Sequence, residues 1–322
     1  MKKDSWRPSS PPETAMRRAA MLGAARRYFA DRKVLEVDTP LLARTTVSDP
    51  QIESLEVLLA GTSCFLQTSP EYFMKRLLAA GYPDIYQVCR AFRAGEAGRR
   101  HQPEFTLIEW SRRDFSLQEI MQDAAGLIGA LVEPQRLTSP PVFLEYRDAF
   151  SRFAGVDPLL APADELARAA GADERLMESL GRDRDAWLDL VLSLKVIPGF
   201  GAQRLTVLCH YPASQAALAR TCPAEPAVAD RFEIFYGDLE LANGFVELKD
   251  PGEQERRFAA DQARRRERGL ELRPLDRKLL AALAHGLPDC AGVAVGLDRL
   301  LMINEMADDI RRVQTFAFDE GR

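Results

Sequence analysis

Residues 231–248, which read RFEIFYGDLELANGFVEL, restrict the possible folds more than any other segment of the chain. Gly237-Asp238 is a two-residue turn signal between two strand-like runs, and this pattern predicts an antiparallel hairpin. The chain contains neither a GxGxxG sequence after a first strand nor a GxxxxGKS/T sequence, which excludes the Rossmann and P-loop nucleotide sites. We therefore predict an α+β fold, with an antiparallel sheet flanked by helices. Further strands are expected at 34–42, 64–67, 84–93, 104–110, 205–210 and 291–296, and helices at 15–32, 69–78 and 254–269.

Composition divides the chain into a short arm and one domain. Residues 1–14 contain Lys2 and Lys3 but no apolar core after them, so they predict a disordered arm and not a signal peptide. Residues 15–322 are predicted to form a single domain, with a helical insertion at about 112–200 that is rich in Ala, Leu and acidic residues. No stretch approaches the roughly 20 apolar residues of a membrane span.

Charge and cysteine usage narrow the class of protein further. The formal net charge of -5, from 43 basic and 48 acidic residues, disfavours wholesale binding to nucleic acid. The five cysteines are widely separated, and we interpret them as reduced thiols of a cytoplasmic protein. The three histidines are also isolated in the sequence, so neither a zinc site nor a Cys-His nucleophile is predicted.

The hairpin carries two acids that an ordinary strand does not need. With Gly237-Asp238 as the turn, Phe235 pairs with Glu240, and Glu233 becomes a diagonal neighbour of Glu240 at roughly 7 Å. Two carboxylates at that separation repel each other unless a cation lies between them. From the pair alone, a Mg²⁺ site and a solvated hairpin rim both remain open, and exposed acids favour the rim.

Asn243 and Glu247 have the opposite parity to Glu240. They reach the same face only if the ladder slips by one residue, and Gly244 is the residue type that permits such a bulge. We therefore hypothesise that Glu247 faces a pocket and holds a cationic group of the substrate.

Two other segments carry weaker signals. Arg93 enters the glycine-containing loop 94–103, where its planar guanidinium suits a phosphate. Alternation in the following strand places Phe105, Leu107, Glu109 and Ser111 on one face, although a Phe is more often a core residue than a platform for a base. Gly296 ends a small-residue strand, and Arg299 on the next helical turn can reach a phosphate, stack on a base or lie at the surface.

Three segments together resemble the signature motifs of class II aminoacyl-tRNA synthetases: VLEVDTPLL (34–42), FRAGEAGRRHQPEFTLIEW (92–110) and GVAVGLDRL (292–300). TSPEYFMKRLL (68–78), HQPEFTLIEW (101–110) and ELANGFVEL (240–248) narrow the resemblance to the lysyl branch. It extends from about Ala15 to the C-terminus. Because only about fourteen residues precede the first helix, no anticodon-binding domain is expected. The chain is most similar to the stand-alone paralogues that attach (R)-β-lysine to elongation factor P.

The resemblance implies a role for each matching residue. Glu71 and Glu247 would hold the two amino groups of a lysine-like substrate and Asn243 its carboxylate, within a substrate set of Ser69, Pro70, Glu71, Ser111, Asn243 and Glu247. Arg93 would hold the α-phosphate of ATP, and Phe105 with Arg299 would enclose the adenine, within an ATP set of Arg93, Ala94, Gly95, Gln102, Phe105, Glu240, Leu241, Gly296 and Arg299. Glu233 and Glu240 would bind Mg²⁺. No nucleophile or general base is implied, and catalysis would come from positioning by groups such as Arg93 and Arg299.

The implied activity is the ATP-dependent adenylation of (R)-β-lysine or lysine, followed by its transfer to a lysine side chain of elongation factor P. A homodimer with 34–42 at its interface is expected, with no tRNA partner. Alternatives are a truncated synthetase-like enzyme that charges another acceptor, and a catalytically silent paralogue that regulates or binds an amino acid.

Five positions depart from the lysyl-tRNA synthetase pattern. Ala94-Gly95 stand where the family usually has Asn-Glu, so either Glu96 substitutes through a slipped loop or that contact is lost. Ser111 replaces a substrate-contacting Tyr. Ser69 and Ala242 replace an Ala and a Gly, and the extra methyl of Ala242 is expected in the pocket floor, where it would suit a β-amino acid.

Overall fold

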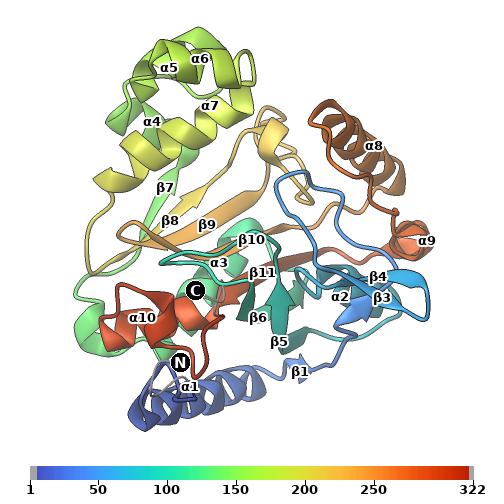
Figure 1. The fold of residues 1–322 in the computed structure, drawn as a ribbon, viewed down its shortest axis with the longest axis vertical. Helices are drawn as coiled ribbons and strands as arrows, with labels where there is room; N and C mark the ends of the chain where they lie inside the picture. The colour runs from blue at the N-terminus through green and yellow to red at the C-terminus, as the bar shows by residue number, and fades with distance from the viewer. Residues whose placement is uncertain (1–5, 319–322) are drawn as a thin grey trace.

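The structure, a computed structural model, describes residues 6–318 (Figure 1). Its α-helices are α1 Pro12–Asp31, α2 Glu71–Ala79, α3 Leu117–Leu131, α4 Tyr146–Phe153, α5 Ala163–Ala170, α6 Glu174–Leu180, α7 Arg184–Val191, α8 Pro251–Glu267, α9 Arg277–Gly286 and α10 Leu297–Glu305. Its strands are β1 Leu35–Glu36, β2 Leu42–Ala43, β3 Glu56–Leu59, β4 Thr62–Leu66, β5 Ile85–Phe92, β6 Glu104–Arg113, β7 Val142–Glu145, β8 Leu205–Cys209, β9 Arg231–Tyr236, β10 Leu239–Val246 and β11 Cys290–Gly296.

A large sheet with the strand order β1-β5-β6-β11-β10-β9-β8-β7 forms the centre of the molecule (Figure 1). The strands from β5 to β8 pair antiparallel, and only the edge strands β1 and β7 run parallel to their neighbours. The prediction of an α+β fold with an antiparallel sheet is therefore confirmed. β11, which follows all the other strands in the sequence, lies between β6 and β10.

The 231–248 hairpin has the predicted turn, with Leu239 opposite Tyr236 and Glu240 opposite Phe235. The predicted bulge exists but lies earlier, because the register shifts between Glu240 and Ala242 and leaves Leu241 as the extra residue. Gly244 has a different role from the one expected. A Cβ at this position would lie 2.6 Å from the Phe232 ring and 2.7 Å from Val293 Cβ, so close packing between strands requires the glycine.

One face of the sheet is fully covered by α1, α3 and α10. Its core consists of apolar side chains of these helices packed on alternate strand residues such as Ile108, Trp110, Ile234, Val293 and Val295. α1 buries Met21, Ala25 and Phe29 on one side, and Ser116 caps α3 through a complete capping box.

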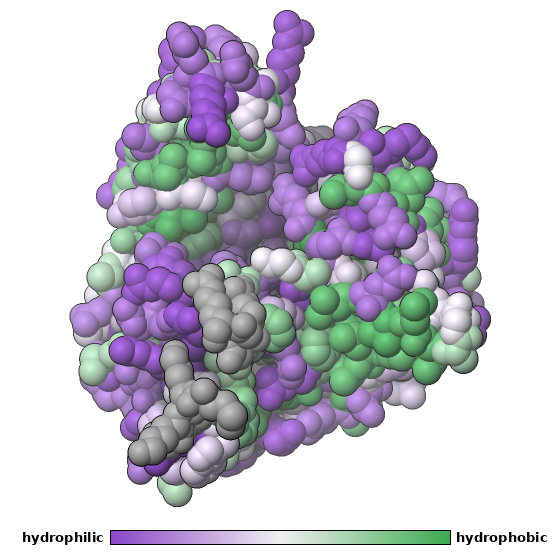
Figure 2. All heavy atoms as spheres, in the orientation of Figure 1, coloured by the Kyte–Doolittle hydropathy of each residue, from purple (hydrophilic) through white to green (hydrophobic). Residues whose placement is uncertain are grey.

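The opposite face is covered only at its two ends. Ile85 and Cys290 pack with α2, α8 and α9 at one end, and Leu208 and Phe235 pack with the helices α4 to α7 at the other. Figure 2 shows a hollow between these two groups, above the middle strands. Polar residues on the middle strands are therefore free to face a ligand.

The helical insertion predicted at about 112–200 is smaller than expected. β6 continues to Arg113, and α3 belongs to the main core, where it contacts α1, β10 and β11. The separate helical cluster comprises α4 to α7, which share their own apolar core around Trp187 and Phe150. The segment also contains the edge strand β7, which the sequence pattern did not indicate because its residues alternate between half-buried and exposed positions.

The predictions for the N-terminal region need two corrections. Helix α1 begins at Pro12, and the Ser9 amide donates to the carbonyl of Thr315, so the part of the arm after residue 5 that the structure describes is held against the chain. Residues 1–5 lie outside the described residues. The predicted strand 34–42 is extended but forms only the two-residue ladders of β1 and the start of β2.

A small second sheet, β2-β4-β3, carries apolar side chains on its surface. Leu58 and Leu59 of the edge strand β3 are 73% and 57% exposed, and Leu41 beside β2 is 41% exposed. Figure 2 shows an apolar patch at the right of the molecule, on the side where Figure 1 places β3 and β4. Within residues 6–318, none of the helices is long and apolar enough to cross a membrane.

Candidate active site

A row of side chains crosses the open face of five strands. Strand pairing aligns Gln87 with Glu109, Glu109 with Ala294, Ala294 with Asn243, and Asn243 with Glu233. Facing residues of paired strands project to the same side, so the ladder brings two amides, two carboxylates and a small methyl together. The predicted alternation in 104–111 is correct, because Ile108 and Trp110 lie in the helix-covered core and Glu109 does not.

Glu109 is the most enclosed acid of this row. It is 6% exposed, and both of its oxygens accept hydrogen bonds from the Ser69 hydroxyl, at 3.1 and 2.9 Å. Ser69 in turn accepts a hydrogen bond from the Glu71 amide at the start of α2. Burial raises the pKa of Glu109 to about 8, and the nearby charge of Glu71 adds to the rise. Glu109 was not among the sequence-predicted site residues, although its parity placed it on the correct face.

Glu71 and Glu247 are brought together by a residue that sequence reasoning missed. Lys75 Nζ lies 2.8 Å from Glu71 Oε1 and 2.7 Å from Glu247 Oε2. Burial alone would lower the pKa of Lys75, but the carboxylates of Glu247 and Glu71 outweigh this effect and raise it. The prediction that Glu247 turns inward is confirmed, because its side chain is 2% exposed.

Gly292 leaves space for Glu247. A Cβ at position 292 would lie 2.7 Å from Glu247 Oε1 and 3.5 Å from Ser111 Oγ, so any side chain here would displace the carboxylate. Glu247 Oε1 therefore lies above Gly292 on the open face, with Ser111 on the adjacent strand. Pro70 precedes α2 and directs Glu71 toward this side.

Arg93 and Phe105 lie together at the other end of the open face. The Arg93 guanidinium is 5.1 Å from the centre of the Phe105 ring and forms an ion pair with Glu96 at 3.6 Å. Gly95 is left-handed, with a φ of 78°, and follows Ala94, whose amide donates to Glu53. Glu96 thus lies beside Arg93, and whether it replaces the nucleotide contact of the usual Glu stays a prediction.

Arg299 contacts two other residues at the end of the open face where the ATP site is predicted, Glu240 and His101. Its Nη1 donates to the Glu240 carbonyl at 2.6 Å and lies 3.5 Å from Glu240 Oε2, while Nη2 is 2.9 Å from Nε2 of His101. The nearest atoms to a Cβ on Gly296 would belong to the Arg299 side chain, at 3.8 Å, so Arg299 packs beside Gly296.

Glu233 and Glu240 lie on the same face, as predicted, but their surroundings differ. Glu240 is 42% exposed, whereas Glu233 is bound by Arg231 Nη2 at 2.5 Å and by the Tyr211 hydroxyl at 2.6 Å. Burial raises the pKa of Glu233, Arg231 opposes the rise, and the negative charge of Glu240 adds to it. This repulsion between the two carboxylates is the kind that a divalent cation relieves, and the donor set of carboxylate oxygens fits Mg²⁺.

Three sequence expectations are not met by the side chains involved. Leu241 and Ala242 are both buried in the helix-covered core, and Ala242 pairs with Ile234 and Val295 there, so its methyl does not lie in the pocket floor. Ala294 occupies the floor position instead. Gln102 is 4% exposed and its oxygen accepts a hydrogen bond from the Phe318 amide, which turns this side chain toward the C-terminal segment.

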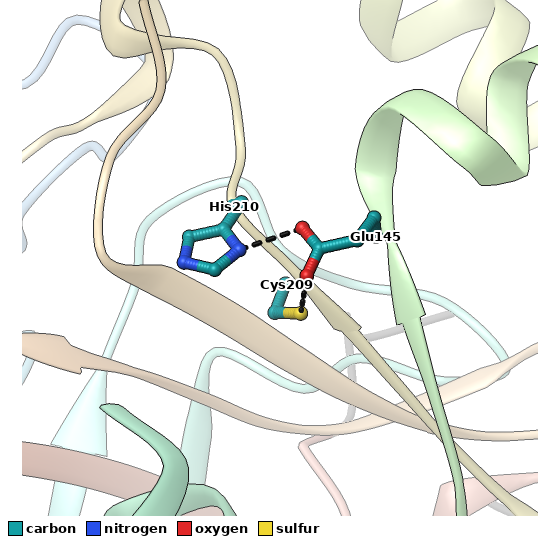
Figure 3. A group of neighbouring side chains, drawn as sticks. All are labelled: Glu145, Cys209 and His210. Carbon is teal, nitrogen blue, oxygen red and sulfur yellow. Dashed lines mark hydrogen bonds and ion pairs between the residues drawn. The ribbon is translucent and has the colours of Figure 1, made fainter. Parts of the chain in front are cut away.

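A second polar cluster brings together residues that are far apart in the sequence (Figure 3). Glu145 from β7 accepts a hydrogen bond from Cys209 at 3.7 Å and lies 2.6 Å from His210 Nδ1. The statement that the histidines are isolated therefore holds only for the sequence. Geometrically, this group could hold a metal. Asp230 on the other side, with Cys209 and Glu145, raises the pKa of His210 to about 12, which favours a protonated imidazole beside Glu145. The cluster thus joins β7 to β8 as an ion pair.

The family described as tRNA synthetases class II (D, K and N) matches residues 5–320. The chain belongs to this class II synthetase family.

Curated relatives narrow the similarity to a particular kind of enzyme. The elongation factor P–(R)-beta-lysine ligase of Klebsiella pneumoniae is 42% identical over 324 residues, which is 98% of this chain and 98% of the relative. The protein of the same name from Salmonella agona matches with the same identity and coverage. The resemblance stated from the sequence motifs is therefore confirmed.

Proposed function

We propose that this protein is an ATP-dependent ligase that activates (R)-β-lysine and transfers it to a lysine side chain of elongation factor P. The observation that carries the proposal is the cluster of Glu71, Glu109 and Glu247 on the open face. These three buried or half-buried carboxyl groups fit a substrate with two ammonium groups. The relatives that share 42% of the sequence over nearly the whole chain carry the name of this activity.

The substrate carboxylate attacks the α-phosphorus of ATP, which forms the aminoacyl adenylate and releases pyrophosphate. The ε-amine of the acceptor lysine then attacks the acyl carbon, an amide bond forms and AMP leaves. ATP use follows from membership of the class II family. No group of the chain needs to act as a nucleophile, because orientation and charge neutralisation lower the barrier.

In this proposal the open face is divided between the two substrates. Glu71, Glu109 and Glu247 hold the amino groups, and Asn243 lies beside Ala294 within reach of the substrate backbone. Arg93 holds the α-phosphate, and Phe105 and Arg299 enclose the adenine. Mg²⁺ is held by Glu240, with Glu233 as the second carboxylate, and would neutralise charge on the phosphates.

The proposal includes elongation factor P as the protein partner and a homodimer as the assembly. The relatives' name supports the partner. The exposed leucines of β3 and of the segment 34–42, namely Leu35, Leu41, Leu58 and Leu59, support a protein interface, because an apolar edge strand readily pairs with another chain. A cytoplasmic location agrees with five cysteines that are all free.

ATP–pyrophosphate exchange tests the first half of the reaction. We expect exchange that depends on (R)-β-lysine and, more weakly, on lysine. Incubation with ATP, (R)-β-lysine and purified elongation factor P should then add the mass of one lysyl unit to elongation factor P. Absence of exchange with every lysine isomer would reject the enzyme and favour a silent paralogue. Exchange without any mass increase would point to another acceptor.

A further inference from the structure

The pocket for the amino groups contains an ammonium group of its own. Lys75 on the second turn of α2 is 2% exposed and lies between Glu71 and Glu247, with the Phe245 ring centre 5.6 Å from Nζ. A fully buried lysine is rare unless it is paired. Its position in the centre of the acidic cluster, and not at the rim, requires an explanation.

The shortest ion-pair contacts of Lys75 involve one oxygen of each acid. Nζ contacts Oε1 of Glu71 and Oε2 of Glu247. Oε1 of Glu247 points instead to the space above Gly292, near Ser111. Oε1 of Glu247 thus lies on the open face, and the shared cation holds the carboxylates of Glu71 and Glu247 close to each other.

The charges of the cluster are unbalanced in a way that matches the substrate. Three carboxyl groups, those of Glu71, Glu109 and Glu247, share the single ammonium of Lys75. Among the described residues, no cation forms an ion pair with Glu109, whose oxygens are bound only by Ser69. The cluster therefore holds more acidic groups than cations: Glu71 and Glu247 share Lys75, and Glu109 has no cationic partner among the described residues, which favours a ligand that brings ammonium groups.

We propose that Lys75 is a positioning residue that fixes Glu71 and Glu247 for the two ammonium groups of the diamino-acid substrate. This inference rests on the proposed function. Without Lys75, the two carboxylates repel each other, separate or take up protons, and the pocket loses the arrangement that a diammonium ligand needs. Lys75 does not touch the reacting carboxylate, so its loss should affect binding of the amino acid more than the chemical step.

The test compares Lys75→Met with wild type in ATP–pyrophosphate exchange. We expect the KM for (R)-β-lysine to rise about tenfold or more, as for a lost charge-assisted contact, while the KM for ATP stays within about twofold and kcat changes less than KM. Lys75→Arg keeps the cation and should restore part of the affinity. Lys249→Met is the matched control, because Lys249 also pairs with an acid, Asp289 at 2.6 Å, but is 42% exposed.

A purely structural role would lower the active fraction, and hence kcat, without changing the KM for the amino acid. If Lys75→Met does not fold, Lys75→Gln, which keeps hydrogen-bond donors without the charge, is measured in the same way. A folded neutral variant with the wild-type KM for (R)-β-lysine would overturn the inference. Wild-type protein without exchange would instead reject the proposed function, so the two failures are distinguishable.

Discussion

At the scale of single residues, Glu109 lies in the proposed pocket, and burial of its charged form lowers the stability of the fold. Its pKa of about 8 in the folded protein exceeds the ordinary value of 4.5, so the folded state binds the extra proton and stability falls as the pH rises from about 4.5 to 8. Glu109→Gln should therefore raise the melting temperature most at pH 8.5 and hardly at pH 4.5. It should also lower kcat/KM for (R)-β-lysine by about 10-fold to 100-fold, because a charged partner of an ammonium is lost.

Thermal melting at the two pH values and exchange kinetics measure these effects. Glu104→Gln is a suitable control, because Glu104 lies on the same strand but its side chain is 53% exposed. If Glu109→Gln destabilised the protein equally at both pH values, the buried charge of Glu109 would not be the source of the stability difference.

The two alanines of the central strands give a second prediction. Ala294 lies between Asn243 and Glu109 on the open face, whereas Ala242 lies between Ile234 and Val295 in the core. Ala294→Gly should change the ratio of kcat/KM for (R)-β-lysine and lysine by about 10-fold or more, the effect of one methyl in a pocket. Ala242→Gly should cost about 1 kcal/mol of stability and leave the ratio unchanged. Exchange kinetics with both isomers decide between the two positions. If only Ala242→Gly changed the ratio, Ala242 beside the bulge, and not Ala294, would determine which lysine isomer is preferred.

Sequence reasoning found the site residues whose partners lie nearby in the chain, and it missed a residue whose partner is distant. Glu233, Glu240 and Glu247 follow from the parity of one hairpin, which is a local property. Lys75 stands four residues after Glu71 and looks like half of a solvated helical ion pair. Its burial arises from Glu247 on a distant strand, and nothing near Lys75 in the sequence signals it.

At the scale of elements, the hairpin shows where prediction stops. The turn and the existence of a bulge followed from residue types, but its location did not, because Leu241 has no property that marks a bulge. The bulge was predicted at Gly244 because glycine is typical of bulges. In the structure, a glycine is needed there because Phe232 and Val293 occupy the space of a side chain. From a single sequence, a glycine required by close packing against neighbouring strands cannot be distinguished from a glycine required by the local backbone conformation.

The junction between β7 and β8 gives a prediction that depends on pH. His210 adopts a left-handed φ of 56°, and its raised pKa of about 12 means that the cluster stabilises the fold fully below pH 6.5 and progressively less as the pH rises toward 12. His210→Asn, which tolerates this conformation, should lower the free energy of unfolding by about 1 kcal/mol at pH 6. Urea titrations should show a smaller difference at pH 9, and exposed His285→Asn should show none. A difference that grows with pH would contradict the ion-pair assignment.

At the scale of the whole molecule, the exposed leucines of β3 predict the assembly. Leu58→Glu should convert a dimer into a monomer, because the charge would be buried without a partner in the interface. Light scattering after size-exclusion chromatography measures the mass directly. Leu160→Glu is the control, since Leu160 is 76% exposed but lies in the segment between α4 and α5. A monomeric wild-type protein would remove the basis for the proposed interface.

The order of strands in the sheet also bears on how cells make this enzyme. β11 is the last strand that a ribosome would synthesise, yet it lies between β6 and β10 and carries Gly292 and Ala294 of the pocket. Until β11 emerges, the edges of β6 and β10 that pair with it in the folded protein lack their strand partner, and an unpaired edge promotes association with other chains. Because Arg299 on α10 follows β11, we expect chains released before residue 299 not to activate an amino acid.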